Sequence, residues 1–594
     1  MTEPRRQRGV LVFLTPFLLV VLAVIVTLAM DAARIYAVRG DMQRVVNAAA
    51  TAAADEAQAC GVGDLGRMRA RALAAARRLG FEGDDSELEV MAGVLSPSSD
   101  NPDQLRFTAT PPAQSNATVV RYSRREPVSS LLPTSLVAPI ELSVNAAARK
   151  ELYAALSANA SAATVHEGLL GNLLGAVLGQ SNYSLDPTDL ASLESTLLGV
   201  GDLLDVLGLD DVTDLLDEPL IDVLDGVVDL LGGVTTPLGA LVNDLTGAAG
   251  LSGLDASAVL SIAGDPSAAK NAEFPLYDFV MSVVLNSASA LGQGAGLLSL
   301  TVDPSQSPAL STLLDNPLLG DLDITLNLKV DNPAPVVIGP ARQAASGDWM
   351  TEVSATDVSL EALVDLHLSA GFLGDLISAL TLTLVQTEIL DHIRVPLVVQ
   401  VGGGRARFIG ARCARGDSNT VDLEILAEPT VANVATGTLD SDGSVSREPI
   451  HATILKLRLL TQPLVNLCVD ADLGLTLPVA GKYQEVVDFP LHCPQAACSG
   501  TFTGGGPTWV EGLDVQLENL ALDCGQPSLL SGLNVVVDLL TPLIETLLNL
   551  VTTVVLQGIV SPLLSILGVD LAGLEVTVVG VDQLGSQLIE NVQL

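Results

Sequence analysis

Residues 10–30 read VLVFLTPFLLVVLAVIVTLAM, a run of 21 residues without a charged side chain. As an α-helix this run is about 30 Å long, which matches the hydrocarbon core of a bilayer. It is longer than the apolar part of a signal peptide, roughly 7 to 15 residues, and no Ala-x-Ala site follows directly. The sequence therefore predicts a retained transmembrane helix, with a cleaved signal peptide or a buried soluble helix as the alternatives.

The orientation of this span follows from the basic residues before it. Arg5, Arg6 and Arg8 immediately precede the apolar run, and basic flanks tend to stay in the cytoplasm. We therefore expect a cytoplasmic N-terminus over 1–9 and a single pass through the inner (cytoplasmic) membrane. The body of the chain would then be periplasmic or extracellular.

A second uncharged stretch runs from Thr546 to Val569. It is long enough to span a bilayer, but it contains polar residues, and no Lys or Arg flanks it. We favour a buried or amphipathic helix pair broken between Gly558 and Pro562, and a second span is the alternative.

The residues after the first span are rich in Ala and predict one helix that continues from the membrane to about Ala59. Its apolar residues are spaced alternately three and four apart, as in a heptad seam. A stripe facing the chain's own core is the favoured interpretation, and packing against another chain is the alternative. The candidate seam consists of Ile35, Val38, Met42, Val45, Ala49 and Ala52.

This N-terminal region resembles the TadG-like proteins of Flp (Tad) pilus systems. The shared features are a basic residue and Gly before the span, an Asp at its exit, an Arg-x-Tyr step, a Met-Gln pair and an Ala-rich helix. In this chain they are Arg8-Gly9, Asp31, Arg34 with Tyr36, Met42-Gln43 and the alanines from Ala48 to Ala54.

The resemblance implies a membrane-anchored structural component of pilus assembly, with a long helix and a small pilin-like sheet over 31–150. It also implies contacts between the N-terminal helix and other pilus-assembly or envelope proteins. The alternative function is an exported binding or adhesive protein that has a TadG-like anchor and no pilus role.

Two departures qualify the resemblance, and one further position distinguishes the chain from cleaved prepilins. Asn47 stands where the family usually has an acidic residue. Asp303, Ser305 and Ser307 match the first part of a von Willebrand type A metal site, but Pro304 and Pro308 interrupt the loop, so we expect no metal there. Leu14 lies five residues after Gly9, where cleaved prepilins carry Glu, so we expect a stationary anchor and no cleavage after Gly9.

The patterns along the whole chain predict an α+β protein. After the anchor and the 31–150 module, Leu and Asp recur at helical spacing between glycines, which predicts short acidic helices over 151–320. Alternating segments predict an antiparallel β-rich domain over 321–527. Leu-rich helices and a closing strand, LEVTVVGV, are expected over 528–594.

Charge and motifs restrict the function. The net charge is −40, and no Lys or Arg occurs between Glu151 and Ala269, so we expect no nucleic-acid partner. The five histidines fall in no metal-ligand spacing, and no nucleotide or hydrolase fingerprint stands in context. We therefore expect no enzyme, no metal and no cofactor. The acidic residues Asp210, Asp211, Asp214, Asp217 and Glu218 lack EF-hand spacing and are expected to form a solvated face.

Six cysteines are present, and an even number in an exported chain permits disulfides. We expect at least one bridge within the cluster of five, in preference to a zinc site, because these residues lie in the β-rich region. The sixth, Cys60, lies far upstream and is expected to remain unpaired. The candidate cysteines are Cys413, Cys468, Cys493, Cys498 and Cys524.

Overall fold

The computed structural model describes most of the chain. The described residues are 10–98, 101–129, 138–160, 167–180, 183, 187–295, 297–301, 319–368, 385–389, 393–402, 404–414, 420–429, 431–440, 443–459, 466–476, 484–492, 499–504, 514–521, 574–583, 587–590 and 592. The chain is a mixture of helices and mainly antiparallel sheets, as predicted. The stretch Thr546–Val569 lies outside the described residues.

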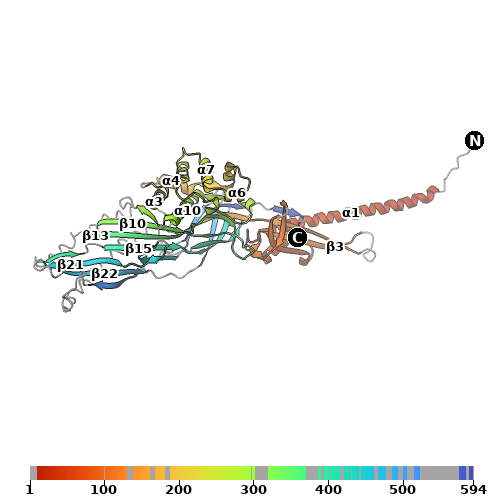
Figure 1. Cartoon of the computed structure of the whole chain (residues 1–594). Helices are drawn as coiled ribbons and strands as arrows, with labels where there is room; N and C mark the ends of the chain where they lie inside the picture. The colour runs from red at the N-terminus through yellow and green to blue at the C-terminus, as the bar shows by residue number, and fades with distance from the viewer. Residues whose placement is uncertain are drawn as a thin grey trace, which may run out of the picture.

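The first element, α1 (Val10–Ala54), is one helix of 45 residues that passes through Pro16 without a break. It is long and apolar enough to cross a membrane, and it projects from one end of an elongated molecule (Figure 1). The helix ends before Ala59, the predicted end, because the chain turns at Glu56, whose buried carboxylate is paired with Arg67 and Arg71 of the next helix.

A small sheet packs against the second half of α1, and we call this assembly the membrane-proximal module. Its five antiparallel strands lie in the order β2-β1-β3-β4-β27. One core joins Val46 of α1 to Met68 of α2 and to Val120 and Ala146 of the sheet. The elements are α2 (Leu65–Arg78), β1 (Leu88–Ser98), β2 (Asn101–Ala109), β3 (Ala117–Glu126), β4 (Ile140–Arg149) and β27 (Gln587–Glu590).

The edge strand β27 comes from far along the sequence. It pairs with the end of β4, where Gln587 lies opposite Arg149. Asn47 of α1 donates a hydrogen bond of 2.7 Å to Glu590, and Asn145 donates one of 3.1 Å to the carbonyl of Val592. A carboxylate at position 47 could not donate the first of these bonds. Distant segments of the chain are therefore fixed together in the membrane-proximal module.

The rest of the described chain, from residue 151 to 583, forms the body. Its largest sheet has nine strands along the long axis of the molecule (Figure 1). The strands are β9 (Leu298–Thr301), β10 (Leu319–Asp331), β13 (Asp357–Leu368), β14 (Val385–Ile389), β15 (Ile393–Gly402), β18 (Val431–Thr436), β21 (Ile450–Leu459), β22 (Asn466–Thr476) and β25 (Asp514–Ala521).

Two smaller sheets lie in the part of the body nearest the module. A five-stranded sheet has the order β24-β26-β5-β11-β7, with a parallel pair at β11 and β7. A four-stranded sheet has the order β12-β16-β17-β23. The strands are β5 (Leu152–Ala160), β7 (Leu260–Ile262), β11 (Val336–Pro340), β12 (Glu352–Ser354), β16 (Arg405–Arg412), β17 (Thr420–Glu428), β23 (Glu485–His492), β24 (Ser499–Gly504) and β26 (Leu574–Gln583).

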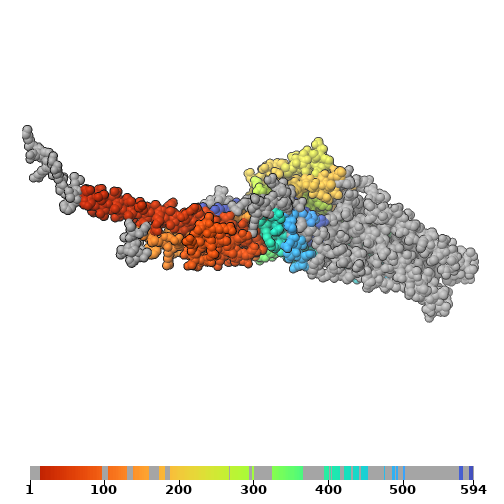
Figure 2. All heavy atoms as spheres, turned by 180° about the vertical axis from the view of Figure 1, so that it is seen from behind, coloured from red at the N-terminus to blue at the C-terminus, as the bar shows by residue number. Residues whose placement is uncertain are grey.

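Short helices cover one side of the body, as the Leu and Asp pattern predicted (Figures 1 and 2). The longest, α10, carries buried residues such as Phe279 and Val283 and packs between the other helices and the sheets. Gly208 ends α5 in the left-handed conformation that favours glycine, with φ 70°. The helices are α3 (Glu167–Leu178), α4 (Pro187–Ser195), α5 (Val200–Leu207), α6 (Val212–Asp217), α7 (Leu220–Leu230), α8 (Pro237–Thr246), α9 (Pro266–Ala269) and α10 (Leu276–Ala295).

The body also contains two sheets of two strands each. One pairs β6 (Leu197–Gly199) with β8 (Glu273–Pro275), and the other pairs β19 (Thr438–Leu439) with β20 (Val445–Ser446).

The five-stranded body sheet combines segments from three regions that the sequence patterns had divided, 151–320, 321–527 and 528–594. These regions therefore fold together and share one hydrophobic core.

Candidate functional site at the junction

The module and the body meet where β4 runs directly into β5. Only Lys150 and Glu151 separate the two strands. The amide of Lys150 donates to the carbonyl of Asn116 at 3.1 Å, and the amide of Leu152 donates to the carbonyl of Ala59 at 3.1 Å. The junction is thus anchored on both sides by loops of the module.

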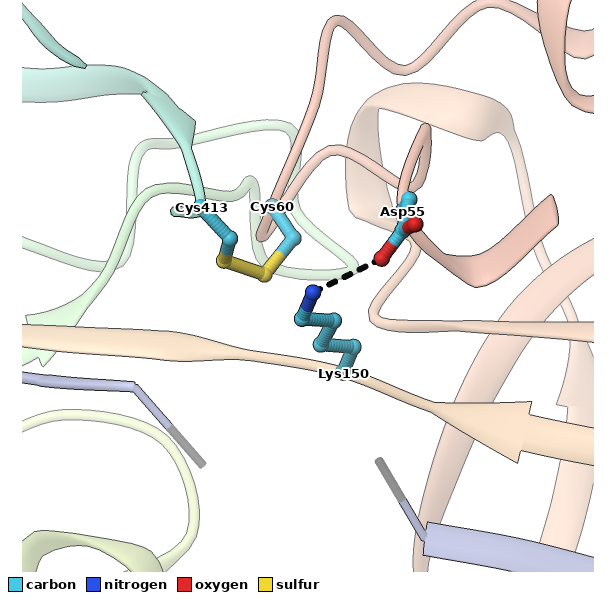
Figure 3. The surroundings of a disulfide bond; sticks show 4 residues. All are labelled: Asp55, Cys60, Lys150 and Cys413. Carbon is cyan, nitrogen blue, oxygen red and sulfur yellow. Dashed lines mark hydrogen bonds and ion pairs between the residues drawn. A yellow bond between two sulfur atoms is a disulfide. The ribbon is translucent and has the colours of Figure 1, made fainter. Parts of the chain in front are cut away.

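A disulfide joins the two parts covalently. Cys60 lies in the loop after α1 and Cys413 directly follows β16 of the body, with a Cα–Cα distance of 5.1 Å. Beside the bridge, Lys150 Nζ lies 2.8 Å from Asp55 Oδ1 (Figure 3). The expectation that Cys60 is unpaired was wrong, because the fold brings its loop to the end of a strand that is 353 residues away in the sequence.

A buried ionic cluster lies at the same junction. Glu151 is fully buried, and its carboxylate accepts hydrogen bonds from Arg149 at 2.8 Å and from Arg342 at 2.7 Å. Asn116 donates a further bond of 3.0 Å to it, and Arg149 also reaches Asp265 at 2.8 Å. Apart from Arg149 and Glu151, which are close neighbours, these residues come from separate segments of the chain. A buried network with its groups paired fixes geometry, because a different arrangement would leave charges unpaired in a poorly solvated site.

The titration of nearby groups reflects this environment. Burial alone would lower the pKa of the Arg149 guanidinium, but the charges and hydrogen bonds of Glu151 and Asp265 raise it above its usual value. Burial, together with the negative charge of Glu151, raises the pKa of the Tyr153 hydroxyl. That hydroxyl accepts a hydrogen bond of 2.9 Å from the amide of Asp265. Arg149 therefore stays charged and Tyr153 stays neutral at physiological pH.

Direct contacts elsewhere along the boundary add to this attachment. Gln58 Nε2 donates to the carbonyl of Ile409 at 2.7 Å, and the amide of Gln343 donates to the carbonyl of Ala113 at 3.0 Å. The amide of Cys413 donates to the carbonyl of Cys60 at 3.3 Å. The arrangement holds the two parts of the molecule in one fixed orientation.

The candidate seam on α1 lies mainly inside the module. Met42, Val45 and Ala49 are buried in its core, and Val38 packs against that core. Ile35 and Ala52 are only half-buried and lie outside this cluster. The stripe therefore faces the chain's own sheet, which was the favoured interpretation, and the stripe actually buried continues through Ala53 and Ala57.

Several predicted residues fall elsewhere. Cys413 is paired with Cys60, whereas the side chains of Cys468, Cys493, Cys498 and Cys524 lie outside the described residues, so a bridge within the cluster stays a prediction. Residues 303–307 also lie outside them.

The described part of the acidic region shows a solvated face. Asp210, Asp214 and Asp217 are exposed, and Asp211 caps the N-terminus of α6 by accepting from the amide of Thr213. Within the described residues, no group of three or more His, Cys, Asp or Glu side chains is placed to hold a metal ion.

Charge is distributed unevenly between the parts. Residues 31–150 contain 14 basic and 14 acidic residues, whereas residues 151–594 contain 12 basic and 54 acidic residues. The negative charge of the chain therefore belongs almost entirely to the body.

The sequence patterns predicted the long apolar helix α1 but did not predict the ionic cluster. The run Arg149-Lys150-Glu151 between two apolar strands was the one available signal, since charged residues inside such a run need partners when buried. No family model, curated protein or solved structure matches this chain.

Proposed function

We propose that the chain is an exported structural component anchored in the inner membrane by α1, as part of an Flp/Tad-type pilus assembly or a related surface system. The observation that carries the export is the buried Cys60–Cys413 disulfide, because such bridges persist in oxidising compartments and are rare in the cytoplasm. The resemblance of the N-terminal region to TadG-like proteins supports the assignment to pilus assembly.

In this proposal the junction gives the molecule its mechanical role. The disulfide and the ionic cluster make the module and the body move together, so a force on the body is transmitted to α1 and the membrane. With Met42, Val45 and Ala49 occupied by the chain's own core, a partner would contact the exposed face of α1 between Ala32 and Gly40. Tyr36, which is 81% exposed, lies in the middle of that face.

Reporter fusions test the topology. Alkaline phosphatase fused after Leu594 should be active, and a fluorescent protein that matures only in the cytoplasm should stay dark at the same position. An inactive phosphatase together with a fluorescent fusion would reverse the proposed topology.

Photo-crosslinking tests the partner. A photoreactive amino acid in place of Tyr36 should cross-link the chain to membrane proteins of the secretion machinery in its own host. The same residue in place of Val46, which is fully buried in the module core, is the matched control and should give no such product. Adducts to lipid only at position 36 would favour the binding or adhesive alternative.

A further inference from the structure

The two bridged cysteines are neighbours among the cysteines of the chain. No cysteine lies between Cys60 and Cys413, although 353 residues separate them. If the chain leaves the cytoplasm from α1 onward, as the proposed function requires, Cys60 emerges first and meets no other thiol of its own chain until Cys413 follows. The native pair is therefore the pair that chain order alone would select.

Cys60 also belongs to a different core from the helix that precedes it. The core of the module contains Ala53, Ala57 and Met68 but not Cys60, which packs into the core of the body with Leu152. The module core draws on residues 42–148, all of which emerge early. The Cys60 thiol consequently stays uncovered on the module until the body arrives.

In the finished junction neither sulfur is accessible. Cys60 is 0% exposed and Cys413 is 5% exposed, so a protein catalyst cannot reach them once the body has docked. Oxidation must therefore come before the junction closes.

We propose that a thiol–disulfide oxidoreductase of the export compartment acts on this chain during translocation and joins Cys60 to Cys413 in chain order, without the need for a disulfide isomerase. This inference rests on the proposed export. The Cys60 thiolate attacks the catalyst's disulfide, which gives a mixed disulfide and frees one catalyst thiol. The Cys413 thiolate then attacks the Cys60 sulfur and releases the second thiol. Two electrons and two protons pass to the catalyst, which ends as a dithiol.

The test places a competing cysteine between the pair. The variant Thr235→Cys adds a thiol at an exposed turn, and Val486→Cys adds one at an exposed position after Cys413 as the matched control. The full-length proteins are expressed in bacteria that lack either the periplasmic oxidase or the periplasmic isomerase. Acid quenching, alkylation and peptide mapping by mass spectrometry then identify the pairs.

We expect the unmodified chain to form the Cys60–Cys413 bridge fully without the isomerase and to lose most of it without the oxidase. When the isomerase is absent, Thr235→Cys should lose most of the native bridge to one between Cys60 and the introduced thiol, whereas Val486→Cys should retain the native bridge. Full native pairing of Thr235→Cys without the isomerase would overturn the proposal, because folding would then select the pair. Free thiols at both Cys60 and Cys413 of the unmodified chain, in bacteria with both catalysts, would instead refute the export itself.

Discussion

Replacing the buried carboxylate of Glu151 by an amide, Glu151→Gln, perturbs the ionic cluster and keeps its shape. Glu151 is fully buried, and the side chains of its partners Arg149 and Arg342 are only 5% and 9% exposed. After the change Arg149 keeps Asp265 as a partner, but the carboxylate contact of Arg342 is lost. Removing one member of a buried ion pair typically destabilises a protein by about 3–5 kcal/mol. We expect a loss of this size in the free energy of unfolding.

Guanidinium unfolding of the full chain in detergent gives the change in stability, and hydrogen exchange of the peptide that carries residues 149–153 shows where it acts. The matched control is Glu424→Gln, which removes the carboxylate of an ion pair between Glu424 of β17 and Arg412 of β16. This pair lies on the surface, with the side chains of Arg412 and Glu424 53% and 27% exposed. Surface pairs contribute at most about 1 kcal/mol. If Glu151→Gln destabilised the chain no more than Glu424→Gln, the cluster would not be what holds the junction.

Three further changes probe the same assembly. Cys413→Ser opens a loop of 353 residues, and the chain-entropy relation gives a loss of stability of about 6 kcal/mol as an upper value. Unfolding with and without reductant measures this loss, and a value below about 1 kcal/mol would contradict a stabilising role. Tyr153→Phe removes the hydrogen bond from the amide of Asp265 and should lower stability by about 1 kcal/mol near neutral pH. Because the folded-state pKa of Tyr153 is raised, the stability that its hydroxyl contributes is complete below the unfolded pKa of about 10 and is lost as pH rises through the folded value. The free energy of unfolding, measured at rising alkaline pH, should therefore decline less in the variant than in the unmodified chain. An equal decline in both proteins would refute this. Deleting residues 587–594 removes β27, so hydrogen exchange should become faster in β4 and stay unchanged in β17, whereas unchanged exchange in β4 would contradict the closing role of β27.

Local sequence patterns predicted the helices and strands whose formation depends on neighbouring residues. The apolar run and its Ala-rich continuation correspond to α1, the alternation in 421–427 corresponds to buried Val421, Leu423 and Ile425 of β17, and glycines separate the acidic helices as expected. Each of these depends on residues a few positions apart.

Contacts between distant segments could not be predicted from such local patterns. β26 pairs with β5 across more than 400 residues, β27 closes the sheet of the module, and Cys60 pairs with Cys413. Each of these strands carries an ordinary β pattern that fits many partners. The ionic cluster depends on the same pairings, because Arg342, a partner of Glu151, follows β11, which pairs with β5. Asp265, the partner of Arg149, follows β7, which pairs with β11.

If α1 is anchored in a membrane as proposed, the uneven charge of the two parts affects the electrostatic repulsion between the body and anionic lipid headgroups. From Met30 to Ala54 the helix rises about 36 Å, and α1 continues the long axis of the molecule away from the body (Figure 1). Electrostatic repulsion at physiological ionic strength decays over about 8 Å. In the proposed anchoring, residues 31–150, which carry equal numbers of acidic and basic residues, would therefore act as a spacer several screening lengths thick, and the acidic body and the lipid headgroups would scarcely repel each other. In this proposal residues 151–594, with 54 acidic against 12 basic residues, are kept clear of the membrane surface although their charge is not balanced.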